Sequence, residues 1–166
     1  MYELKRLAQK NLDGAVTLAK HYRDLNQPEE AESICRDVLD VAPENEEAWK
    51  TLGLALTDRF PAAYMSLFDE AIKAFERLSA EYDRLYYTGI AWERYAKAQL
   101  AAGRGHNALH AFEEAIERFQ AAEKVGRADD AAPVLHYNHC VRALLTHPEL
   151  VRVSQVPHKP EFDFGD

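Results

Sequence analysis

A helical pattern of core-type residues that returns after 34 residues constrains the fold of this chain more than any other feature. The first copy of the pattern has helical spacing, and the same four positions return further along the chain. The two sets are Ala15, Leu18, Ala19 and Tyr22, and then Trp49, Leu52, Gly53 and Leu56. Because residues three and four apart share one face of a helix, each set predicts one apolar stripe. A repeat period of 34 residues is typical of repeat proteins in which each unit is a pair of helices.

Turn and capping signals divide the first part of the chain into such pairs. Pro28 is followed by two acids and is suited to a helix start, since the first turn leaves its N–H groups unpaired in any case. The stripe of this second helix is Ala31, Ile34, Cys35 and Val38. Pro43 ends the unit, and the side chain of Asn45 can cap the next helix. We expect Gly53 to lie where the two helices of a pair approach closely, because it has no side chain.

The second pair departs from the pattern through an insertion. The small residue expected in its second helix arrives late, at Ala71, and an apolar stripe runs ahead of it. We therefore predict a lengthened second helix that begins near Arg59, rather than a loop, with its stripe at Tyr64, Phe68, Ala71, Phe75 and Leu78. Aromatic residues around the insertion are predicted to fill the space between lengthened helices, and the alternative is an exposed patch. They are Phe60, Tyr64, Tyr82, Tyr86 and Tyr87.

The rest of the chain supplies a third pair and one further helix. The third pair is predicted to begin near Asp83 and to turn at residues 103–105, with apolar positions at Trp92, Tyr95, Ala96, Ala108, Phe112 and Ala115. Pro133 opens the further helix, whose apolar residues are Leu135, Tyr137, Cys140, Val141, Leu144 and Leu145. Residues 148–156 are expected to fold back as a cap. The chain thus divides into a helical domain over residues 1–156 and an extended acidic and aromatic tail over 157–166, where two prolines disfavour helix.

The pattern Trp49-x2-Leu52-Gly53, followed by a small residue, a large apolar residue and a proline, resembles the tetratricopeptide repeat, in which two antiparallel helices form each unit. The resemblance covers residues 12–146 and is clearest in the first repeat and the start of the second. It implies an all-α fold, an antiparallel helix-hairpin superhelix of about three repeats plus a C-terminal helix. The alternative is an unrelated bundle of helical hairpins, because small and large apolar residues recur in any antiparallel helix pair.

In that family the first helix of each repeat lines a concave groove that holds another protein. The resemblance places in the groove the candidate site residues Lys20, Arg23, Lys50, Leu54, Arg94, Lys97, Tyr137 and Asn138, with Val16, Thr57, Glu93 and Val141 beside them. An asparagine at this level hydrogen-bonds the backbone of an extended peptide in similar repeats, and Asn138 is the matching candidate unless it is a surface amide. The basic residues favour an acidic segment as the ligand, unless nearby acids make the groove a solvated mixed surface.

Charge and hydropathy narrow the function classes. The formal charge of -8, from 28 acidic and 20 basic residues, repels phosphate backbones, so we expect no nucleic-acid partner. No apolar run approaches the roughly 18 residues that a membrane span needs, and the first residues lack the apolar core of a signal peptide. Cys35 and Cys140 fit no metal or redox motif and are predicted to be buried thiols in a reducing compartment. These features favour a cytoplasmic protein with no membrane partner.

Histidines supply the only candidate chemistry. His106 and His110 lie four apart on one helical face and could form a metal patch, but the apolar stripe predicts that this face points to water. His136 and His139 adjoin Cys140, yet the three cannot all point the same way. With no phosphate-binding loop or nucleophile motif in the sequence, we predict neither an enzyme nor a cofactor.

The expected function is that of a protein–protein interaction adaptor or scaffold, which binds an extended or helical segment of a partner protein or peptide, including an acidic one, in the concave groove. One alternative is a structural subunit of a homo-oligomer or a small chaperone-like scaffold. A histidine-based metalloprotein is the less favoured alternative.

Overall fold

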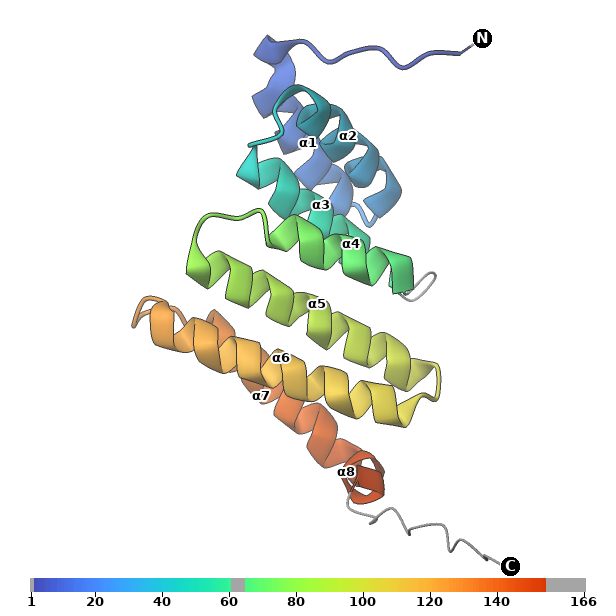
Figure 1. The fold of residues 1–166 in the computed structure, drawn as a ribbon, viewed down its shortest axis with the longest axis vertical. Helices are drawn as coiled ribbons and strands as arrows, with labels where there is room; N and C mark the ends of the chain where they lie inside the picture. The colour runs from blue at the N-terminus through green and yellow to red at the C-terminus, as the bar shows by residue number, and fades with distance from the viewer. Residues whose placement is uncertain (1, 61–64, 155–166) are drawn as a thin grey trace, which may run out of the picture.

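The computed structural model describes residues 2–60 and 65–154, and every regular element in these two ranges is a helix (Figure 1). They are a short 3-10 turn η1 (Gln9–Asn11) and the helices α1 (Leu12–Asp24), α2 (Pro28–Val41), α3 (Glu46–Asp58), α4 (Met65–Phe75), α5 (Glu81–Ala101), α6 (Gly105–Val125), α7 (Ala132–Thr146) and α8 (Pro148–Ser154). Consecutive helices run back and forth and pack in adjacent pairs, α1 with α2, α3 with α4, α5 with α6 and α7 with α8. The predicted all-α class of paired helices is confirmed.

Each pair packs on the next mainly through its second helix, which contacts the first helix of the pair that follows. We call α1, α3, α5 and α7 the A helices, and the second helix of each pair the B helix. Successive A helices also contact one another directly, α1 with α3, α3 with α5 and α5 with α7. Among the B helices, α8 packs against α6.

The predicted helix starts and turns are present. Asn45 Oδ1 accepts a hydrogen bond of 2.9 Å from the N–H of Ala48 and so caps α3. Pro28 and Pro133 stand in the first turns of α2 and α7. Gly103 has a φ of 72° in the turn between α5 and α6, which glycine adopts without the strain that a side chain would add. Helix α5 begins at Glu81 and has 21 residues, so the early start predicted near Asp83 is confirmed to within two residues.

Gly53 lies where α3 and α4 approach each other. A Cβ atom built on Gly53 would stand 2.4 Å from Cε1 of Phe75, whose ring is fully buried. The next pair has the same arrangement, since a Cβ on Gly89 of α5 would stand 2.8 Å from Cε1 of Phe119 on α6. In both pairs a phenylalanine ring of the B helix therefore occupies the space that a side chain on the A helix would need.

The start of the predicted lengthened helix lies outside the described residues. α3 ends at Asp58, and the N–H groups of Arg59 and Phe60 bond to carbonyls three residues back, which closes α3 as a turn. α4 is described from Met65. The sequence contains a reason for the end of α3, because Pro61 has no N–H donor to continue that helix and disfavours helical geometry at the residue before it. Tyr64 of the predicted stripe lies outside the described residues.

Several predicted core positions at the two ends of the stack are exposed. Leu18 of α1 keeps 45% of its surface exposed, whereas Val16, predicted to line the groove, is buried. Leu135 and Leu145 of α7 are also exposed, the latter to 74%. The equivalent Leu52 of α3 is buried because α3 has an A helix on each side, whereas α1 and α7 contact one described A helix each.

The aromatic residues near the insertion mostly fill the interior. Phe60 is fully buried, and its ring centroid lies 5.9 Å from that of Phe68. The Phe68 ring in turn lies 4.6 Å from the rings of Trp92 and Tyr95. Tyr86 and Tyr87 are partly buried against the core, and Tyr82 donates its hydroxyl hydrogen to Asp130. The prediction of core filling is confirmed for Phe60 and for the two tyrosines at 86 and 87.

Both cysteines are buried thiols, as predicted, and burial raises the pKa of each, Cys35 and Cys140, to about 12 from an ordinary 9.0. Near neutral pH the reactive thiolate should therefore be about a thousandfold scarcer in the folded protein than in the unfolded chain. We expect iodoacetamide to label neither cysteine appreciably until denaturant is added, as judged by intact mass. Labelling of the native protein at the rate seen in guanidinium would show that the thiols are accessible.

No helix within residues 2–60 and 65–154 combines the length and the apolar character that crossing a bilayer requires.

Candidate functional site

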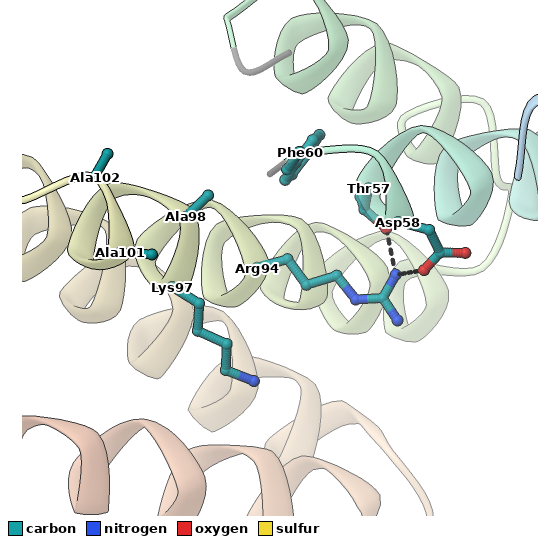
Figure 2. Close-up of a pocket in the computed structure, with 8 residues that line it drawn as sticks. All are labelled: Thr57, Asp58, Phe60, Arg94, Lys97, Ala98, Ala101 and Ala102. Carbon is teal, nitrogen blue, oxygen red and sulfur yellow. Dashed lines mark hydrogen bonds and ion pairs between the residues drawn. The ribbon is translucent and has the colours of Figure 1, made fainter. Parts of the chain in front are cut away.

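Asp58 on α3 joins three A helices through its carboxylate. Nε of Arg23 on α1 donates to one carboxylate oxygen at 2.8 Å, and Arg94 on α5 donates to the other. The same guanidinium donates to the hydroxyl of Thr57 at 2.6 Å, so Arg94 is held across the gap between α5 and α3 (Figure 2). Planar guanidinium groups suit such multiple contacts, because their donors diverge in a fixed geometry.

Glu47 forms a second, more exposed bridge between α1 and α3. It accepts a hydrogen bond of 2.6 Å from Lys20 on α1 and another from Lys50 one turn further along α3. The hydrogen bonds from Lys20 and Lys50 lower the pKa of the Glu47 carboxyl. Because Lys20 and Glu47 are about half exposed, such pairs contribute at most about 1 kcal/mol to stability. The lysines are therefore held by a carboxylate that a ligand can compete with.

Glu93 on α5 is the third carboxylate, and unlike the others it is buried, with 3% of its surface exposed. Lys97 donates to one oxygen at 2.6 Å, and Nδ1 of His136 on α7 donates to the other at 2.6 Å. Nε2 of His139 lies 3.8 Å from the first oxygen. Burial alone raises the pKa of Glu93, but the hydrogen bonds from His136 and Lys97 outweigh it and leave the pKa below 4.5. This cluster ties α5 to α7.

The predicted basic residues of the groove therefore lie on one face, which we call the A-helix face. Its five cations are Lys20, Arg23, Lys50, Arg94 and Lys97, and each pairs with Glu47, Asp58 or Glu93. Leu54 is partly buried between α3 and α5. Tyr137 on α7 packs against the buried cluster that contains Phe112, Phe119 and Cys140, and Asn138 is partly buried on the same helix.

A pocket of about 530 Å³ opens on this face between α3 and α5, and we call it the α3–α5 pocket (Figure 2). It is lined by Thr57, Asp58, Phe60, Arg94, Lys97, Ala98, Ala101 and Ala102. The alanines and the phenylalanine make its wall apolar, while the two basic residues stand at its edge. Thr57, Arg94 and Lys97 could be predicted from the sequence. The alanines and Phe60 could not, because alanines are typical of any helix and Phe60 was predicted only to fill the space between lengthened helices.

The two predicted histidine clusters have different surroundings. His106 and His110 are exposed on α6, and the His110 ring contacts the edge of Trp92 at a centroid distance of 5.8 Å. His136 is committed to Glu93 and stacks on Phe119 at 5.1 Å. Within residues 2–60 and 65–154, no three histidine, cysteine or acidic side chains are placed so that they could hold a metal ion.

The fold and this face define a helical-repeat-like protein. Neither the family models nor the curated proteins compared with this chain gave a match. The likeness to tetratricopeptide repeats therefore rests on the residues of the chain itself.

Proposed function

We propose that the chain is a divergent tetratricopeptide-repeat protein of the cytoplasm whose A-helix face binds an extended segment of a partner protein, and that it acts as an adaptor without catalytic activity of its own. The observation that carries the proposal is the clustering of five cations on the A-helix face, where they share the carboxylates of Glu47, Asp58 and Glu93. These cations stand on a protein of net charge -8. Complementary charge steers and orients a partner, so the favoured ligand is an acidic segment.

The exposure of these groups supports binding rather than a purely structural role. Lys20 and Lys97 are nearly half exposed, and Glu47, which holds Lys20, is equally exposed. Each lysine ammonium has three N–H donors, so a carboxylate of a ligand can accept a hydrogen bond from Lys20 or Lys97. The pocket beside Lys97 adds an apolar contact for a side chain of the ligand.

A display library of random dodecapeptides, selected on the full-length protein, tests the proposal directly. We expect peptides rich in Asp, Glu and aromatic residues to be enriched. The triple variant Lys20→Gln, Lys50→Gln, Lys97→Gln should weaken binding of the enriched peptides by about ten- to hundredfold, since each exposed ion pair contributes up to about 1 kcal/mol. Fluorescence polarisation measures the change.

The control removes two exposed lysine charges elsewhere. Lys73 on α4 and Lys124 on α6 are exposed and lie on B helices, so Lys73→Gln with Lys124→Gln should leave peptide binding nearly unchanged. Circular dichroism establishes that both variants are folded. If the two variants weakened binding equally, or if no peptide were enriched over an empty support, the A-helix face would not be the binding site.

A homo-oligomeric subunit is the second candidate, and the exposed leucines at the ends of the stack favour it. Leu18 and Leu25 lie on or next to α1, and Leu135 and Leu145 lie on α7. Internal repeats normally bury such residues against the next unit, and terminal repeats are usually polar there. Light scattering separates the two candidates, because an adaptor is expected to keep the mass of a monomer at concentrations where a structural subunit assembles.

A further inference from the structure

The segment that follows α8 has the chemistry that the A-helix face is proposed to bind. It contains Phe162 and Phe164, with Glu161 and Asp163 next to them and Asp166 two residues further on. Aromatic residues two positions apart point to the same side when a chain is extended, and Asp163 between them points to the other. An apolar wall beside a basic edge is the surface complementary to such a sequence.

The α3–α5 pocket offers this surface. Its volume of about 530 Å³ falls within the range of about 300–1,000 Å³ that ligand pockets have. Ala98, Ala101 and Ala102 provide an apolar wall for a ring. Lys97 at the edge is 45% exposed and uses one hydrogen bond on Glu93, so its ammonium has donors for a further carboxylate.

The segment also begins close enough to reach the pocket. Leu150 of α8 packs on Gly105, where its Cδ2 atom lies 2.8 Å from the position that a Cβ would take. Gly105 opens α6 three residues after Ala102, which lines the pocket, so α8 and the pocket lie at the same end of α5 and α6. Phe162 stands eight residues after Ser154. An extended chain of that length spans up to about 25–30 Å, against about 10 Å for the diameter of a helix.

We infer that residues 157–166 dock into the α3–α5 pocket of their own chain, with one of the two phenylalanine rings against the alanines and a neighbouring acid against Lys97. The segment then competes with the partner for the A-helix face and sets how readily the partner binds. This inference rests on the proposed function, because it assigns that face a built-in ligand.

Alanine methyl NMR on the full-length protein tests the docking without any partner. A docked ring changes the shielding of nearby methyl groups, so Phe162→Ala with Phe164→Ala should shift the methyl signals of Ala98, Ala101 and Ala102. The methyl signal of Ala128 should stay in place, since it lies beyond the far end of α6, about 30 Å along that helix. Unchanged signals at the three pocket alanines would overturn the inference.

A variant of the pocket provides the reciprocal test. Ala101 is exposed on α5, so Ala101→Leu should narrow the pocket without disturbing the core, and the signals of Phe162 and Phe164 should move toward random-coil values. The control Ala128→Leu should leave them unchanged. Shifts that vanish on dilution would overturn docking within one chain in favour of docking between copies. The proposed function fails separately, if no displayed peptide binds a protein whose tail carries both alanine substitutions.

Discussion

Phe75→Ala is expected to lower the free energy of unfolding by about 3–5 kcal/mol, which is the usual cost of truncating a buried phenylalanine. The ring has no exposed surface, stacks on Tyr87 at a centroid distance of 5.6 Å and lies against Gly53. Its removal would leave a cavity between α3 and α4 at the point where the two helices are closest. Urea denaturation followed by circular dichroism measures the loss.

The contact with Gly53 makes a sharper test through a double-mutant cycle. Gly53→Ala alone should cost about 1–3 kcal/mol, because the new methyl group overlaps the Phe75 ring. In the Phe75→Ala background the overlap is gone, and the same change should be neutral or stabilising by up to about 1 kcal/mol, since alanine is the better helix former. The exposed Leu145→Ala, as control, should change stability by no more than about 0.5 kcal/mol. Additive effects at 53 and 75 would contradict the contact.

The helix pairing could be predicted from the sequence because its signals are local. Stripes at helical spacing, Asn45 as a cap and Pro28 at a helix start depend only on neighbouring residues. The end helices were predicted less well, since the same pattern buries Leu52 in the middle of the stack but leaves Leu18 exposed at its edge. Which side of a helix is covered depends on its neighbours in space.

The third pair contains a close helix contact that the sequence did not indicate. Trp92, Tyr95 and Ala96 repeat the spacing of Trp49, Leu52 and Gly53, and Ala96 is buried as predicted. The structure places Gly89, about two turns of helix before Ala96, against Phe119 as Gly53 lies against Phe75. A search for a glycine on the A helix and a phenylalanine on the B helix would have found the correspondence.

The sequence predicted which charged residues belong to the candidate site, but it did not predict which of them form ion pairs with one another. The five cations could be assigned to one face from the family likeness. That Asp58 would hold both Arg23 and Arg94 depends on the offset between three helices, which no local pattern records. The α3–α5 pocket was missed for the same reason, because it exists only where the turn at Phe60 meets the alanines of α5.

The buried carboxylate of Glu93 links α5 to α7. Its carboxylate is buried between α5 and α7 and is satisfied by Lys97 and by His136, while the His136 ring is held by stacking on Phe119. A buried charge is costly unless such partners remain, so the cluster is sensitive to the loss of any member. The cluster adds a polar link between α7 and α5 to the apolar packing of α7 against α6.

Glu93→Gln is therefore expected to lower the free energy of unfolding at neutral pH by about 1.5–3 kcal/mol, the usual worth of a hydrogen bond to a charged group. Since the folded-state pKa of Glu93 lies below its ordinary 4.5, its stabilisation is complete above that value and is lost as the pH falls through the folded-state pKa. The variant should lack this part of the acid dependence, so the two curves of stability against pH should converge on acidification. Glu113 is exposed on α6, so the control Glu113→Gln should show the same dependence of stability on pH as the wild type. Curves for Glu93→Gln and the wild type that stay parallel down to acidic pH would show that Glu93 does not titrate as this cluster requires.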